Sequence, residues 1–132
     1  MRLENPLAPG STIGILGGGQ LGRMLALAAG ELGFSCHIFA PEADSPAFQV
    51  SGAHTVAGYH DFTALEGFAK SVAVVTYEFE NVPGDTAAFL ESRVALAPGS
   101  GALKTAQDRV DEKTFIAGLG IPVLALLLIN AL

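Results

Sequence analysis

Cysteine, basic residues and long apolar runs are all scarce in this sequence of 132 residues. A single cysteine, Cys36, leaves no internal disulfide framework. Seven Lys and Arg residues against 13 Asp and Glu residues give a net charge of −6 and no sign of the basic surface that nucleic acids and anionic membranes require. The longest apolar run, Ile121 to Ile129, contains Pro122 and is shorter than the roughly 20 residues of a membrane-spanning helix. We therefore expect no nucleic-acid partner and no membrane anchor, and the lack of a secretion signal predicts a cytoplasmic protein.

Recognisable patterns of metal ligands and nucleophiles are lacking as well. His37, His54 and His60 share no metal-like spacing with one another or with Cys36. No nucleophile stands beside a base in a known arrangement. The sequence therefore predicts no metal site and no catalytic residue within this chain.

What the sequence does contain is an alternation of strand-like and helix-like segments. Short β-branched or apolar runs bounded by Gly and Pro predict strands at 12–16, 35–40, 53–58, 72–80 and 94–97. Apolar residues at helical spacing predict helices at 20–32, 61–70, 84–93, 101–107 and 108–120. This order predicts an α/β fold with a Rossmann-like parallel sheet flanked by helices.

A glycine-rich loop separates the first predicted strand from the first predicted helix. Gly17, Gly19 and Gly22 fit G-x-G-x-x-G, the spacing of dinucleotide-binding loops. Free amides at such a helix start favour an anion or a polar ligand. An NAD site also needs an acid at the end of the second strand, where Phe39 and Ala40 stand instead. We expect the loop to bind a ligand, with an NAD-binding module as the less favoured alternative.

Two carboxylates follow the most strand-like segment, in TYEFENVP. If the backbone stays extended there, Glu78 and Glu80 point to one side, while Tyr77 and Phe79 point to the other. Open parallel sheets bind ligands at the carboxyl ends of their strands, so the pair suggests a ligand with amino or hydroxyl groups; a solvated loop is the alternative. Gln20 both donates and accepts hydrogen bonds, and it serves either a ligand or an ordinary first helical turn.

Four stretches occur in a characteristic order. They are IGILGGGQLGRMLALAA at 13–29, PEADSPAFQV at 41–50, VVTYEFENVP at 74–83 and QDRVDEKTFIAGLGIP at 107–122. Together they resemble the N-terminal, pre-ATP-grasp region of the 5-(carboxyamino)imidazole ribonucleotide synthase family, the ATPase subunit of phosphoribosylaminoimidazole carboxylase, in the ATP-grasp superfamily. The resemblance covers nearly the whole chain.

The resemblance implies a ligase of purine biosynthesis. Such an enzyme uses ATP and Mg²⁺ to join bicarbonate to the amine of 5-aminoimidazole ribonucleotide, which gives N5-carboxyaminoimidazole ribonucleotide. It further implies a homodimer of the full-length enzyme, and a glycine loop that binds the ribonucleotide instead of a nicotinamide cofactor. Another ATP-grasp ligase, of the formate-using glycinamide ribonucleotide transformylase type, is the alternative.

The resemblance also assigns individual residues. It places five of them at the substrate: Gly19, Gln20, Leu21, Glu78 and Glu80. Arg109 matches an arginine that reaches the ATP site. On the residues alone, the alternative for Arg109 is a solvated charged helix face, because Lys113 lies four positions on and acidic residues surround both.

The resemblance further suggests how the chain is divided. We expect an N-terminal extension at 1–11, a Rossmann-like pre-ATP-grasp domain at 12–99, a helical connection at 100–120 and the start of an ATP-grasp domain at 121–132. The leucine-rich stretch IPVLALLLINAL has no polar ending, so we expect a chain truncated before the ATP-grasp domain. Because the resemblance places the phosphate loop, the nucleotide lysine and the metal ligands in that domain, we expect this chain to be inactive by itself.

Overall fold

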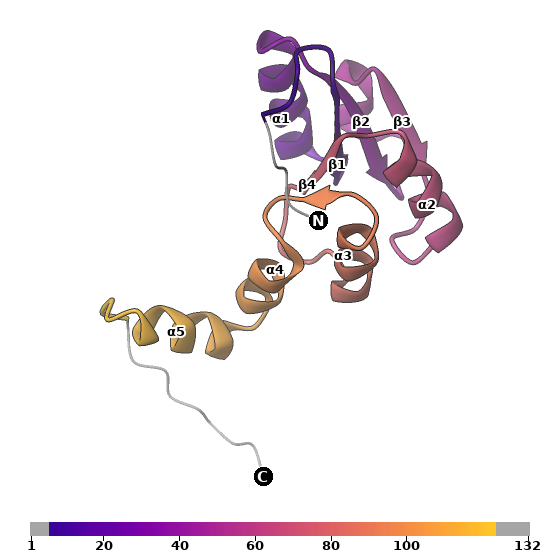
Figure 1. The fold of residues 1–132 in the computed structure, drawn as a ribbon. Helices are drawn as coiled ribbons and strands as arrows, with labels where there is room; N and C mark the ends of the chain where they lie inside the picture. Colours follow the sequence, from indigo (N-terminus) through magenta and orange to yellow (C-terminus); the bar gives the residue numbers. More distant parts are fainter. Residues whose placement is uncertain (1–5, 124–132) are drawn as a thin grey trace.

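A computed structural model describes residues 6–123 and shows alternating strands and helices (Figure 1). The expected segment 121–132 and the first residues of the expected extension fall largely outside this range. The strands are β1 (Thr12–Leu16), β2 (Ser35–Ala40), β3 (Ala53–Val56), β4 (Val74–Tyr77) and β5 (Ala95–Leu96). The helices are α1 (Gln20–Glu31), the 3-10 helix η1 (Pro46–Val50), α2 (Phe62–Lys70), α3 (Gly84–Glu91), α4 (Ser100–Gln107) and α5 (Arg109–Gly118).

The strands form one parallel sheet in the order β3-β2-β1-β4-β5. The chain starts at the central strand β1, builds outward to β3, and returns to the other side of β1 with β4. Leu16, the last residue of β1, pairs with Phe39 of β2 and with Tyr77 of β4. The predicted parallel α/β sheet is confirmed, and its topological switch point lies between the carboxyl ends of β1 and β4.

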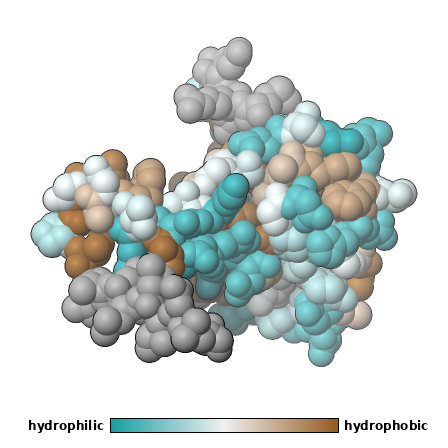
Figure 2. Space-filling view, turned by 90° about the horizontal axis from the view of Figure 1, so that it is seen from below, coloured by the Kyte–Doolittle hydropathy of each residue, from teal (hydrophilic) through white to brown (hydrophobic). Residues whose placement is uncertain are grey.

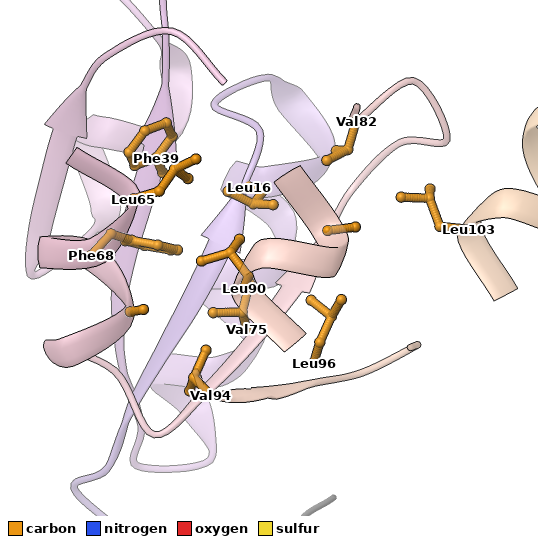
Figure 3. Packing of buried hydrophobic residues seen from close by; sticks show 12 residues of the cluster. Leu16, Phe39, Leu65, Phe68, Val75, Val82, Leu90, Val94, Leu96 and Leu103 are labelled. Atoms are coloured by element: carbon orange, nitrogen blue, oxygen red, sulfur yellow. The ribbon is translucent and has the colours of Figure 1, made fainter. Parts of the chain in front are cut away.

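The central strands contribute side chains to two separate hydrophobic cores, one on each face of the sheet, because successive strand residues point to opposite faces. On one face, Leu16 and Phe39 pack against α2 and α3 (Figure 3). On the other face, Ile15 and Ile38 pack against α1 and η1. Helices thus cover both faces of the sheet, which explains why its strands are apolar on both sides.

The face that α1 buries differs from the face that its leucine spacing suggests. The buried residues of α1 are Gly22, Ala26 and Ala29. Leu21 and Leu25, which recur at helical spacing in the sequence, are 56% and 42% exposed. Small residues let the helix lie close to the sheet, and they leave the larger apolar side chains outside.

Helix ends largely follow the local signals of the sequence. Asp61 accepts a 2.9 Å hydrogen bond from the amide of Ala64 and caps α2. Asp108 separates α4 from α5 and accepts hydrogen bonds from the first-turn amides of α5. Gly33 follows α1 with a φ of +82°, a conformation that favours glycine. These three positions are the caps and stop that the sequence predicts.

The last two helices differ in how they join the domain. Leu103 anchors α4 in the core shared with α3, whereas α5 has no buried residue and extends away from the sheet (Figure 1). Phe115 of α5 and Leu119, which directly follows the helix, are more than half exposed. Brown surface lies over α5 at the left of Figure 2. Within residues 6–123, no helix is long and apolar enough to cross a membrane.

Candidate functional site

The glycine loop and Glu78 meet at the switch point of the sheet. Gly17 directly follows β1 and Glu78 directly follows β4, and the Glu78 amide donates a 3.1 Å hydrogen bond to the carbonyl of Leu16. This bond extends the pairing of β1 with β4 by one step, and it brings the Glu78 side chain over the start of α1. Two segments almost sixty residues apart therefore form one site.

The carboxylate of Glu78 is bound by the glycine loop itself. Its Oε1 atom accepts a 3.0 Å hydrogen bond from the amide of Gly19, and its Oε2 atom accepts a hydrogen bond from the amide of Gly22. The N-cap residue of α1, Gly19, has no side chain to accept a hydrogen bond from the first-turn amides. The first turn of α1 also contains no acidic residue. Glu78 therefore supplies, from the neighbouring strand, the negative charge that a helix N-terminus favours.

The loop glycines are explained by this internal packing. Gly17 has a φ of +111°, and a Cβ atom there would overlap the Glu78 side chain. A Cβ atom at Gly18 would lie 2.5 Å from Cβ of the buried Ser45. A Cβ atom at Gly22 would lie 2.5 Å from the carbonyl oxygen of Gly17. Each position lacks room for a side chain because parts of this same chain approach the loop.

Two backbone amides at the start of α1 have no hydrogen-bond acceptor among the described residues. Within residues 6–123, the amides of Gln20 and Leu21 donate to no side chain or carbonyl of the chain. Both residues are exposed at the start of α1. Leu21 lines an open cavity of about 430 Å³ together with Glu78, Tyr77 and neighbouring residues of α1. The structure thus brings Gly19, Gln20, Leu21 and Glu78 together at one edge of the sheet.

Comparison with known proteins identifies the family to which the chain belongs. A family model described as the ribonucleotide synthetase preATP-grasp domain matches residues 10–107. The chain belongs to this family. The sequence resemblance to the N-terminal region of such synthases is thereby confirmed.

Individual relatives agree with the family match. The chain is 48% identical over 118 residues to the N5-carboxyaminoimidazole ribonucleotide synthase of Brucella melitensis, across 89% of this chain and 33% of that protein. A solved ADP complex of an N5-carboxyaminoimidazole ribonucleotide synthetase has a TM-score of 0.89 and 43% identity, across 93% of this chain and 33% of that one. The solved structure of the Aspergillus clavatus N5-carboxyaminoimidazole synthase, in complex with ADP and 5-aminoimidazole ribonucleotide, has a TM-score of 0.78 and 33% identity. This match covers 86% of this chain and 31% of that one. The preATP-grasp chain therefore spans about a third of the length of these relatives.

Glu80 occupies a different environment from Glu78 in this preATP-grasp domain. Strand β4 ends at Tyr77, and residues 78–82 bend and turn, so the extended backbone expected through Glu80 is not observed. The Glu80 side chain is exposed, while its backbone carbonyl accepts a 2.8 Å hydrogen bond from Gln107 Nε2 of α4. Glu78 and Glu80 both line a cavity of about 320 Å³ between this turn and α4.

Arg109 lies apart from the glycine loop. It is the first residue of α5, its Nη1 atom is 2.8 Å from Glu112 Oε2, and its side chain is 76% exposed. Within residues 6–123, no group of three or more His, Cys, Asp and Glu is placed to hold a metal ion. The ATP contact of Arg109 stays a prediction.

Sequence reasoning missed three residues that shape the site. Ser45 is 5% exposed against Gly18, and its hydroxyl donates a 2.7 Å hydrogen bond to the carbonyl of Glu42. Burial and the charges of Glu42 and Glu78 raise the pKa of Tyr59 to about 12, so its hydroxyl stays protonated at neutral pH. Gln107 Nε2 holds the turn after β4. The PEADSPA stretch indicated only a loop, and no pattern in it marked Ser45 as buried.

Proposed function

We propose that this chain is the substrate-binding part of an ATP-dependent ligase that carboxylates 5-aminoimidazole ribonucleotide with bicarbonate to N5-carboxyaminoimidazole ribonucleotide. The observation that carries the proposal is the meeting of Glu78 with the glycine loop at the switch point of a preATP-grasp domain. The Aspergillus clavatus relative, which carries 5-aminoimidazole ribonucleotide and ADP, supports this choice of substrate.

The chemistry of the site suits such a ribonucleotide. Each carboxylate oxygen has two lone-pair directions, and the loop amides use one hydrogen bond on each oxygen of Glu78. The remaining acceptor capacity favours the amine and hydroxyl groups of the substrate. The amides of Gln20 and Leu21 supply donors next to it, and the Gln20 side chain adds a group that both donates and accepts. Glu80 lies at the rim of the neighbouring cavity and contributes a second negative charge.

In this proposal, parts of the whole protein outside the described residues carry out the phosphoryl transfer from ATP. ATP and Mg²⁺ supply the activation of bicarbonate when bound, and the residues described here position the amine that is carboxylated. Arg109 extends toward the nucleotide from the start of α5 in this proposal. The complete enzyme is proposed to be a cytoplasmic homodimer.

The test uses the complete reading frame that contains this chain. The purified enzyme should form ADP only when 5-aminoimidazole ribonucleotide and bicarbonate are both present, and the carboxylated product should be detected by mass spectrometry. ADP formation supported instead by glycinamide ribonucleotide and formate would assign the chain to the formate-using type of ligase. If neither substrate pair supports ADP formation, the proposal is overturned.

A further inference from the structure

The glycine loop of this domain already contains an anion. In dinucleotide-binding proteins, amides at the start of the helix face a phosphate group of the ligand. Here the same kind of amides, those of Gly19 and Gly22, donate to the two oxygens of Glu78. A carboxylate that bridges two amides at a helix N-terminus satisfies both the hydrogen bonds and the charge that a phosphate would supply.

The Glu78 side chain also fills the space above the loop. A Cβ atom at Gly17 would lie 2.5 Å from Glu78 Oε1, and a Cβ atom at Gly19 would lie 3.0 Å from the same oxygen. A phosphate group in contact with these amides would have to occupy the volume of the carboxylate. It would also bring a second negative charge to a half-buried carboxylate, which electrostatic repulsion opposes.

We propose that Glu78 is the resident anion of the glycine loop and determines its specificity by closing it to phosphate groups. The G-x-G-x-x-G spacing then marks a loop that binds a carboxylate of its own chain. This inference is independent of the reaction proposed above, because it concerns which ligands the loop rejects. It gives a physical reason, beyond the missing acid at Phe39 and Ala40, for the prediction that the loop does not bind NAD.

The inference predicts that removal of the carboxylate opens an anion site. In a Glu78→Ala variant, the amides of Gly19 and Gly22 lose their acceptor, and a space lined by glycine backbone becomes available. Inorganic phosphate and diphosphate have the charge and the acceptor geometry to replace the lost carboxylate. The unsubstituted chain should bind neither anion at this position.

The experiment titrates the 132-residue chain with diphosphate, and with phosphate in parallel, at an ionic strength held constant with chloride. Calorimetry and thermal unfolding are recorded for the unsubstituted chain and the Glu78→Ala variant. We expect diphosphate to bind Glu78→Ala at least about tenfold more tightly than the unsubstituted chain, since two amide donors to an anion become free. Diphosphate should also raise the melting temperature of Glu78→Ala in a saturable way.

Two matched variants separate this effect from general loss of charge. Glu80→Ala removes a carboxylate two residues away that does not contact the loop, and it should show no gain in anion binding. Glu78→Gln removes the charge but keeps the loop filled, and it should show no gain either. Equal diphosphate affinity of Glu78→Ala and Glu80→Ala would overturn the inference, as would tight diphosphate binding by the unsubstituted chain.

A folding defect in Glu78→Ala does not remove the test. If that variant is unfolded in chloride alone, circular dichroism should show recovery of helix upon addition of diphosphate. An unfolded variant that diphosphate does not refold would contradict the inference, because the added anion would then fail to replace the carboxylate.

Discussion

The hydroxyl of Thr86, inside α3, donates a 2.6 Å hydrogen bond to the backbone carbonyl of Tyr59. Thr86 is fully buried, and Tyr59 precedes α2 by three residues. The bond therefore fastens the segment before α2, whose Tyr59 hydroxyl is influenced by the charge of Glu78, to the helix that follows the turn after β4. The buried Thr86 side chain thus connects the core of the domain to the segment that contains Tyr59.

Replacement of Thr86 by Val should destabilise the domain. The substitution keeps the shape of the side chain but leaves the Tyr59 carbonyl without its donor, which costs about 1–3 kcal/mol of the free energy of unfolding. Thr63→Val, on the exposed surface of α2, should change that free energy by less than about 0.5 kcal/mol. Urea denaturation of both variants measures the difference, and equal midpoints would show that the buried bond contributes nothing.

Gly17→Ala tests the packing of the glycine loop. Alanine at a φ of +111° is strained, and its Cβ atom would also displace the Glu78 side chain. We expect a loss of about 2–4 kcal/mol in the free energy of unfolding, since backbone strain and a lost helix cap act together. Gly30→Ala is the matched control, because Gly30 lies in α1 with no atom within 4 Å of an added Cβ. That control should gain about 0.5–1 kcal/mol of helix stability, and a loss similar to that of Gly17→Ala would contradict the packing argument.

The order of elements could be predicted from sequence because local signals and the tertiary fold agree. Gly33 ends α1, Asp61 caps α2, and Asp108 separates α4 from α5, as their residue types suggest. The buried face of α1 could not be predicted in the same way. Its leucines and its small residues both recur at helical spacing, and only the close approach of the sheet selects Gly22 and Ala26 as the buried ones.

The site was predictable in its location and less so in its contacts. Parallel strands bring their carboxyl ends to one edge, so the glycine loop and Glu78 were expected near each other. The hydrogen bonds from Gly19 and Gly22 to Glu78 join residues 59 and 56 positions apart, and no local pattern encodes them. The fingerprint spacing reports a loop that suits an anion, but it does not distinguish an external phosphate from an internal carboxylate.

His37 should make stability depend on pH. Its Nδ1 atom lies 2.8 Å from Ser71 Oγ, and its Nε2 atom lies 2.8 Å from Thr55 Oγ1. Because the Ser71 hydroxyl donates to the Phe68 carbonyl, Ser71 Oγ accepts from Nδ1–H, and Nε2 accepts from Thr55. Burial, with a smaller contribution from His54, lowers the pKa of His37 below 6.5 in the folded state.

The sign of this effect follows from proton linkage. Below about pH 6.5 the unfolded chain takes up a proton at His37 before the folded chain does, so the free energy of unfolding should fall as the solution is acidified. Above about pH 7.5 the contribution is constant. The comparison is made between about pH 5.5 and 7.5, because carboxyl side chains ordinarily titrate at lower pH. His37→Gln should flatten the profile in this range, whereas His54→Gln should weaken it only slightly; identical profiles for His37→Gln and the unsubstituted chain would refute the assignment.

Glu78→Gln in the full-length enzyme tests the substrate contact. The substitution keeps the size of the side chain but removes the charge that attracts the amine and hydroxyl groups of the ribonucleotide. A charge-assisted hydrogen bond of this kind contributes about 1.5–3 kcal/mol, so KM for 5-aminoimidazole ribonucleotide should rise about ten- to a hundredfold. KM for ATP should change little, because Glu78 lies at the glycine loop and Arg109 lies on a separate helix.

Glu80→Gln is the matched control for this measurement. Glu80 follows the same strand and carries the same charge, but its side chain is exposed and does not contact the loop. If only the first acid reaches the substrate, Glu80→Gln should raise KM for the ribonucleotide less than Glu78→Gln does. Steady-state kinetics with each substrate varied in turn separate the two carboxylates. Unchanged ribonucleotide kinetics in Glu78→Gln would limit this carboxylate to its structural contact with Gly19 and Gly22, and the substrate would then have to be recognised by the free amides of Gln20 and Leu21.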